Sequence, residues 1–188
     1  MKLEDQIKSC KNCNLYKTCK LPVAGDGNFK TKILFIGEAP GKEEDEQNKP
    51  FVGRSGKLLT KILENLGYFR EKDYYITNIV KCRPPNNRDP NETEIKTCSP
   101  YLIRQIEEMK PKLIVTLGRF SFNFLVPNIS ITNGRGKAFQ IHGILGQKLD
   151  FSPIVFAIYH PAVALYNPSK IETIKEDLGK IKTILKQK

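Results

Sequence analysis

Hydrophobic positions along the chain fall into short runs that alternate with amphipathic stretches. Four runs, bounded by Gly or Pro and rich in β-branched and aromatic residues, are typical of buried strands: residues 33–36, 74–80, 112–118 and 153–159. Apolar residues recur at helical spacing in four other stretches: residues 57–63, 95–109, 120–125 and 171–185. This alternation predicts an α/β fold with three αβα layers around a mainly parallel central sheet.

The remaining segments carry weaker patterns. Residues 20–32 and 163–168 are predicted to be loops, and residues 42–50 form a charged loop or helical turn. Residues 138–141 favour a short strand, and the nearby His142 is interpreted as structural. Asn91 or Thr93 is expected to cap the helix that ends before Pro111.

The size of the chain fits a single domain over residues 1–188, with enough residues to bury a real core. Its longest apolar runs fall far short of the ~20 residues that span a membrane. Acidic residues at positions 4 and 5 and the absence of an apolar stretch around them argue against a secretory signal. We therefore expect a cytoplasmic protein that does not associate with membranes, and we expect a monomer.

The net charge is +11, from 31 Lys and Arg residues against 20 Asp and Glu residues. A field of this sign attracts polyanions and gives sequence-independent affinity for nucleic acid. Lysine-rich solubility is the alternative explanation, and charge alone does not separate the two.

Five cysteines lie at positions 10, 13, 19, 82 and 98. In a cytoplasmic chain, metal binding is favoured over a disulfide framework. Cys10 and Cys13 form a C-x-x-C pair, and Cys82 and Cys98 lie 16 positions apart in a second region, so that four thiolates can close one site. Zinc and a [4Fe–4S] cluster both suit four thiolates. Cys19 is given no ligand role.

Distinctive groups stand where three of the predicted strands end. Gly37, Glu38 and Ala39 follow the first strand, Asn78 lies in the second, and His160 follows the last. The carboxyl edge of an open α/β sheet is where ligands bind. Asn offers both a donor and an acceptor to an amide-like ring, and the following Pro161 restrains His160. Each group alone has an ordinary structural explanation.

Two further features lie between the first strand and the helix that follows it. Phe51 is an aromatic residue after a long charged segment, and it either packs the core or stacks on a ligand. Arg54 and Ser55 stand in a glycine-rich turn before a helix, which suits either a phosphate seat or a plain N-cap.

Taken together, these motifs resemble the uracil-DNA glycosylase superfamily, specifically the family 4 iron–sulfur uracil-DNA glycosylases. Four motifs carry the resemblance, in order and with the cysteines between them: residues 37–41 (GEAPG), 50–56 (PFVGRSG), 77–84 (TNIVKCRP) and 160–162 (HPA). The resemblance covers nearly the whole chain.

The resemblance implies a [4Fe–4S] cluster that orders loops, with four ligands: Cys10, Cys13, Cys82 and Cys98. It also implies a uracil pocket in which Phe51 stacks on the base, Asn78 reads its polar edge, and the backbone at residues 37–39 contacts it. His160 would donate to the uracil carbonyl on which charge develops as the glycosidic bond breaks. The partner would be uracil-containing DNA, with the base flipped out of the duplex.

Two roles stay open within this family. Ala39 stands where family 1 enzymes carry an Asp that assists the water. Glu38 is the nearest candidate for that task in the sequence, and Glu43 and the adjacent acidic residues are alternatives. Leu165 is the leading candidate for an apolar wedge in the segment after His160.

Two functions of other classes remain alternatives. A metal-stabilised nucleic-acid-binding module would share the charge and the cysteines but would not need Asn78 and His160 at strand ends. An iron–sulfur electron carrier would share the cysteines only.

Overall fold

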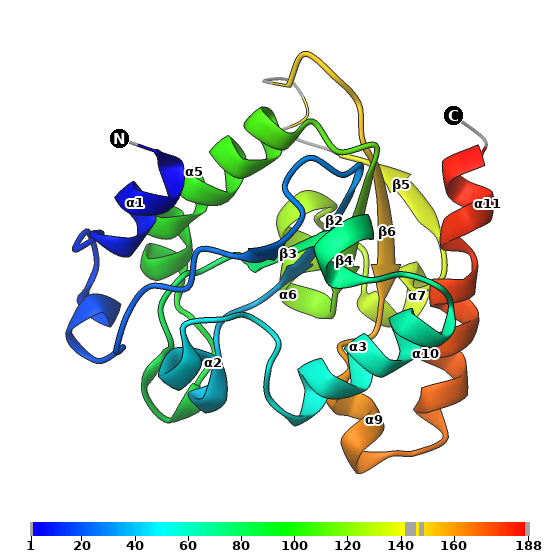
Figure 1. Cartoon of the computed structure of the whole chain (residues 1–188), viewed down its shortest axis with the longest axis horizontal. Coiled ribbons are helices and arrows are strands. Elements are labelled where there is room, and N and C mark those ends of the chain that lie inside the picture. Colours follow the sequence, from blue (N-terminus) through cyan, green and yellow to red (C-terminus); the bar gives the residue numbers. More distant parts are fainter. Residues whose placement is uncertain (1, 142–145, 147–148, 187–188) are drawn as a thin grey trace.

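A six-stranded mixed sheet forms the centre of the computed structural model, which describes residues 2–141, 146 and 149–186 (Figure 1). Its strands lie in the order β1-β3-β2-β4-β6-β5. They comprise β1 (Asp26–Gly27), β2 (Ile33–Gly37), β3 (Tyr75–Asn78), β4 (Leu113–Leu117), β5 (Ala138–Gln140) and β6 (Ile154–Ile158). The four inner strands are parallel, whereas β1 and β5 pair antiparallel at the two edges.

Helices surround this sheet. They comprise α1 (Leu3–Lys8), α2 (Lys42–Gln47), α3 (Arg54–Asn65), α4 (Arg70–Asp73), α5 (Glu92–Met109), α6 (Arg119–Leu125), α7 (Ile131–Gly134), α9 (Ala162–Tyr166), α10 (Lys170–Gly179) and α11 (Ile181–Lys186). Two 3₁₀ turns, η1 (Asn14–Lys17) and η2 (Pro85–Asn87), complete the described elements. None of the described helices is long and apolar enough to cross a membrane.

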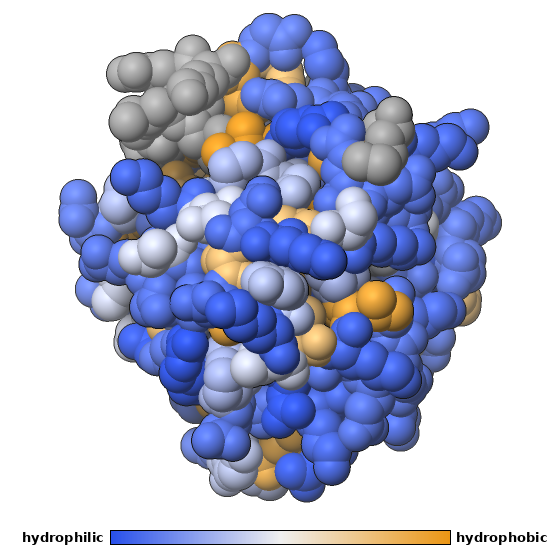
Figure 2. Space-filling model, turned by 90° about the vertical axis from the view of Figure 1, so that its left-hand side faces the viewer, coloured by the Kyte–Doolittle hydropathy of each residue, from blue (hydrophilic) through white to orange (hydrophobic). Residues whose placement is uncertain are grey.

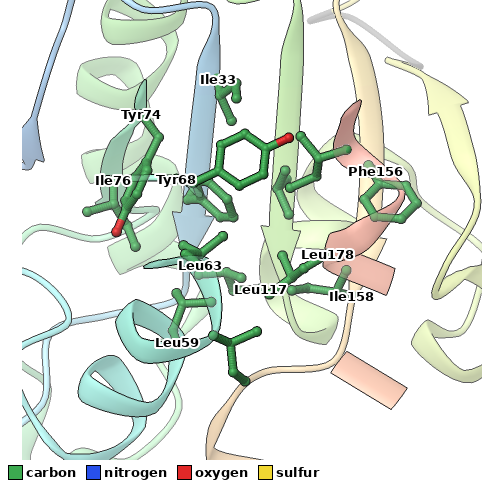
Figure 3. Packing of buried hydrophobic residues seen from close by; sticks show 14 of the residues in the cluster. Ile33, Leu59, Leu63, Tyr68, Tyr74, Ile76, Leu117, Phe156, Ile158 and Leu178 are labelled. Atoms are coloured by element: carbon green, nitrogen blue, oxygen red, sulfur yellow. The ribbon is translucent and has the colours of Figure 1, made fainter. Parts of the chain in front are cut away.

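The alternation of side chains along the parallel strands builds two cores. On one face, Phe35, Val115 and Ile158 pack with residues of α3, α10 and α11. Figure 3 shows this core, with Leu59 and Leu63 of α3 beside the sheet. On the other face, Ile36 and Ile114 are among the residues that pack against α5 and α6. The predicted three-layer αβα fold with a mainly parallel sheet is confirmed.

The strand order places a topological switch at β2. The chain passes from β2 to β3 on one side and then returns to β4 on the other side, and both pairs are parallel. A crevice forms where successive connections leave the sheet in opposite directions, at the carboxyl ends of the strands. The fold therefore places the end of β2, at Gly37, in the position where open α/β sheets bind ligands.

Most of the predicted elements are confirmed, and the long helix α5 begins as expected. The Asn91 side chain accepts from the Glu94 N–H (2.8 Å), and Glu94 Oε2 accepts from the Asn91 N–H (2.9 Å). This capping box satisfies two N–H groups at the helix start. The cap is therefore Asn91 rather than Thr93. His142 lies outside the described residues.

Three predictions for the connections need correction, whereas residues 42–47 form the short helix α2, in agreement with the helical alternative for that segment. The segment 20–32 contains β1, which is too short to show a strand period. Residues 162–166 form α9 instead of a loop, because Pro161 starts a helical turn and Ala-Val-Ala-Leu-Tyr contains no helix breaker. The single closing helix is two helices that meet at Lys180, directly after Gly179.

The surface carries few large apolar side chains. Figure 2 shows a face that is mostly hydrophilic, with small and separate hydrophobic areas. Tyr166 is the most exposed of the large hydrophobic residues in the described part of the chain, at 84%. It lies on α9, directly after the strand that ends near His160.

Candidate active site

A cavity of about 430 Å³ lies at the carboxyl ends of β2, β3 and β6. This volume is within the range of small-molecule sites. Its lining includes six residues that the sequence analysis singled out: Glu38, Ala39, Phe51, Ser55, Asn78 and His160. Segments more than 100 residues apart in the sequence thus meet at one edge of the sheet.

Gly37 allows two of these side chains to approach each other. It pairs with Asn78 across β2 and β3, and both residues are buried. A Cβ atom on Gly37 would lie 2.4 Å from Asn78 Oδ1 and 2.5 Å from Phe51 Cζ. Only glycine fits at this strand end, because any side chain would push the ring and the amide apart.

Hydrogen bonds from Arg70 fix the main chain at Phe51. Its φ is +55°, in the left-handed region that side chains other than glycine rarely adopt. Arg70 donates from Nη2 to the Phe51 carbonyl (3.1 Å) and from Nη1 to the Pro50 carbonyl (2.9 Å). These bonds hold the strained turn and direct the ring toward His160, at a centroid distance of 5.9 Å.

The Asn78 amide has an unused acceptor. Its side chain is 1% exposed, and Oδ1 has no hydrogen-bond partner within the described structure. Buried polar atoms in folded proteins almost always have partners, so an exception that lines a cavity points to a ligand. An N–H group of the ligand is the partner that Oδ1 lacks.

His160 is positioned as a neutral donor. The backbone N–H of Ala162 donates to Nδ1 of His160 (3.1 Å), which assigns the ring proton to Nε2. Burial lowers the pKa of His160 to about 4, although the Glu44 carboxylate opposes this shift. Gly118, with φ of +92°, leaves room for the His160 side chain, since a Cβ atom on Gly118 would lie 2.9 Å from Cβ of His160.

Glu38 carries a carboxyl group with a shifted pKa. Burial, and secondarily the negative charge of Asp89, raises the pKa of Glu38 to about 7, while Arg119 opposes the shift. A smaller cavity of about 230 Å³ also touches Glu38 and His160, next to Arg119. A carboxyl that titrates near neutral pH suits a general base.

The acidic segment after Gly41 directs its neighbouring carboxylates to different places. Glu43 does not line the cavity; its carboxylate faces Lys57 Nζ at 3.8 Å. Glu44 lines it instead, and its Oε1 accepts from the N–H groups of Val52 (2.9 Å) and Gly53 (2.8 Å). The unbroken run of charged residues gave no signal by which to single out Glu44.

The proposed DNA-contacting residues are spread around the cavity. Ser55 lines it, and Arg54 is exposed at the first turn of α3. Leu165 is 38% exposed on α9 but is not among the lining residues, whereas its neighbour Tyr166 is. Asn87 and Arg88, which the sequence analysis did not single out, also line the cavity.

The four predicted cysteine ligands meet at a separate place. Cys10, Cys13, Cys82 and Cys98 line one small cavity, together with Lys81 and Tyr101. Among the described residues, no three His, Cys, Asp or Glu side chains are grouped closely enough to hold a single metal ion. The fold thus brings the four thiols around one space without clustering them at a single point.

Three observations describe the chemistry of these thiols. The backbone N–H of Lys81 donates to Sγ of Cys98 (3.2 Å). Burial raises the pKa of the Cys98 thiol to about 11, and contact with Cys19 together with burial raises the pKa of the Cys82 thiol. Buried thiols that repel each other's charge favour a positively charged group bound among them, and four sulfur donors suit iron or zinc.

The fold and the cavity define a class of α/β proteins in which the carboxyl ends of several parallel strands line a cavity of ligand size. The chain belongs to the uracil DNA glycosylase superfamily, whose family model matches residues 24–183. The resemblance drawn from the four motifs is confirmed.

Relatives narrow the family further. The chain is 50% identical to the "Type-4 uracil-DNA glycosylase" of Saccharolobus solfataricus, over 99% of this chain and 86% of the relative. It is 46% identical to the protein of that name from Archaeoglobus fulgidus, over 94% and 88% of the two chains. The protein of that name from Thermotoga maritima is 41% identical, over 98% and 94%.

Proposed function

We propose that this chain is a monofunctional DNA glycosylase that hydrolyses the N-glycosidic bond of uracil in DNA and so starts base excision repair of deaminated cytosine. The observation that carries the proposal is the unpartnered Oδ1 of Asn78 in a cavity that also holds Phe51 and His160. The names of the type-4 relatives support it.

Uracil matches the cavity by its pattern of donors and acceptors. Its N3–H can donate to Oδ1 of Asn78, and its O4 can accept from the amide nitrogen of the same side chain. Cytosine presents an acceptor at N3 and an amine at C4, so both contacts become unfavourable. Since Oδ1 is buried, a base that leaves it unpaired is rejected strongly.

His160 acts on the leaving group. As the glycosidic bond breaks, negative charge develops on the uracil carbonyl oxygens, and a donor already aimed at that charge lowers the barrier. The pKa of about 4 keeps the ring neutral at pH 7, so it donates a hydrogen bond through Nε2 and transfers no proton. The residual anion is therefore stabilised by the protein's fixed dipoles.

The attacking water requires a different group. We assign this role to Glu38, because it lines both cavities and its raised pKa makes the carboxylate a usable base near neutral pH. Glu43, one of the other candidates from the sequence, faces Lys57 and is dropped from this role.

DNA contacts complete the proposal. The charge of +11 favours the phosphate backbone, and the exposed Arg54 and the half-buried Ser55 stand at the start of α3 beside the cavity. A flipped deoxyuridine would enter past α9, where Leu165 and the more exposed Tyr166 can fill the vacated space in the duplex.

The four-cysteine site is proposed to hold a [4Fe–4S] cluster. A cluster binds one thiolate at each iron, which suits four sulfurs distributed around a space better than four sulfurs at one point. When bound, it would tie the N-terminal segment to α5 and take no part in the chemistry of the base. That the chain acts as one cytoplasmic monomeric domain over residues 1–188 stays a prediction.

A single assay separates the candidate functions. A labelled oligonucleotide with one uracil is incubated with the protein and then cleaved at abasic sites with alkali. Cleavage at the uracil position alone supports the glycosylase. Binding without cleavage would favour a metal-stabilised nucleic-acid-binding module. If the protein neither binds nor cleaves the oligonucleotide, the iron–sulfur electron carrier is the remaining candidate.

A further inference from the structure

A buried lysine lies between the two sites. Lys81 follows β3, and its side chain is 1% exposed. Its ammonium group donates to Thr77 Oγ1, to the Asn78 carbonyl and to Gln105 Oε1, each at 2.7 Å. All three N–H groups of the ammonium are therefore used, and one of them fixes the main chain of Asn78, whose side chain lines the uracil cavity.

This ammonium lacks the usual counter-ion. In the described part of the chain, no carboxylate lies within 4 Å of its nitrogen. A buried cation without an opposite charge is strongly unfavourable. The contacts of Lys81 therefore define its role. Lys81 also lines the cysteine cavity, and its backbone N–H donates to Sγ of Cys98.

The acceptors of Lys81 extend this connection to other segments. Thr77 Oγ1 and Gln105 Nε2 both donate to the Ala24 carbonyl, each at 2.8 Å, and the Val23 N–H donates to the Lys81 carbonyl (2.7 Å). Strand β3, helix α5 and residues 23–24 therefore share one buried polar network with the ammonium at its centre. Such networks hold a unique arrangement only when every member is satisfied.

We propose that Lys81 is a positioning residue that couples the cysteine site to base recognition: its backbone N–H holds Sγ of Cys98, and its side-chain nitrogen fixes the main chain of Asn78. This inference rests on the proposed function and deepens it. It predicts that loss of the Lys81 side-chain nitrogen, or of its acceptor on Thr77, weakens both iron retention and uracil recognition, although neither of these two side chains touches the base.

Three variants test this role. Lys81→Met removes the charge and all three donors while keeping a long unbranched side chain. Thr77→Val removes one acceptor with little change in volume. Thr116→Val is the matched control, because Thr77 and Thr116 lie opposite Ile36 on its two neighbouring strands, both are buried, and only Thr77 contacts Lys81.

Two quantities are measured for the parent and for each variant, all purified without oxygen. The first is the rate at which iron passes to a chelator, followed by visible absorbance. The second is the dissociation constant for free uracil, with affinity for abasic DNA as the reference. Residues that hold a metal ligand in place without binding the metal change metal affinity by about 10–100-fold when they are lost. We therefore expect Lys81→Met to release iron at least tenfold faster and to bind uracil about tenfold more weakly. Thr77→Val should shift both readouts in the same direction.

The outcomes are decisive in both directions. Unchanged iron release and uracil affinity in folded Lys81→Met would overturn the proposal, as would equal shifts in Thr77→Val and Thr116→Val. If Lys81→Met does not fold, the comparison of the two threonine variants decides. Excision by the parent protein is measured separately, so an active parent with unaffected variants refutes the role of Lys81 alone.

Discussion

The rings of Phe51 and His160 face each other at a centroid distance of 5.9 Å, with 34° between their planes. A base inserted between two parallel rings needs a separation of about 7 Å, twice the contact distance of carbon atoms. We therefore expect the base to stack on Phe51 alone and to meet His160 at its edge. On this proposal, the residue that binds the ring differs from the residue that stabilises its charge.

Replacement of Asn78 by Ala tests recognition of the base. The change removes both amide contacts and leaves the groups of the base without partners, at about 1–3 kcal/mol for each. We expect uracil excision to fall by more than tenfold while DNA affinity barely changes. Equal losses of excision and DNA affinity would indicate a folding defect instead of a lost contact.

The pH profile tests the role of Glu38. The raised pKa of about 7 means that Glu38 is protonated below that pH and ionised above it. A base works only when ionised, so single-turnover excision should rise between pH 6 and pH 8 and then level off. Glu38→Gln should be slower and lose this rise. If the pH profile of Glu38→Gln keeps the same rise, Glu38 is not the base that activates the water.

Salt dependence tests the phosphate contact of Arg54. Each phosphate contact contributes about 0.9 to the slope of log affinity against log salt concentration. Arg54→Ala should lower the slope for duplex DNA by about that amount. Arg104→Ala is the matched control, since it removes the same charge from a residue that contacts Gln6 and Glu108 away from the cavity. Equal slopes for Arg54→Ala and the parent exclude the contact.

The metal content tests the four-cysteine assignment. Protein purified without oxygen should be brown, with broad absorption in the blue and about four irons per chain for one cluster. Cys98→Ser should lose most of this absorption. Colourless protein with stoichiometric zinc after the same purification would contradict the cluster.

Much of the sheet could be predicted from the sequence, because the inner strands are buried on both faces and therefore appear as mainly apolar runs. The site groups at Gly37, Asn78 and His160 were found for the same reason, since they interrupt or end such runs. β1 was missed because two residues carry no period, and its pairing depends on β3.

The groups that sequence reasoning missed depend on three-dimensional contacts. Glu43 and Glu44 are equivalent in a charged run, and only the turn at residues 51–53 decides which carboxylate faces inward. In the sequence, nothing distinguishes Lys81 from the many surface lysines, because its burial depends on contacts with β3 and α5. The left-handed φ of Phe51 likewise follows from Arg70, which is distant in sequence.

The central claim is that His160 stabilises the departing uracil, and the single-turnover rate of His160→Ala measures it most directly. An interaction that is stronger in the transition state than in the ground state changes the rate with little effect on substrate binding. Loss of one such donor typically costs ~10²–10³ in rate. We predict a fall of that size, with the fold, the iron content and the affinity for abasic DNA unchanged. Near-parent single-turnover excision by His160→Ala would contradict the account and make the histidine structural.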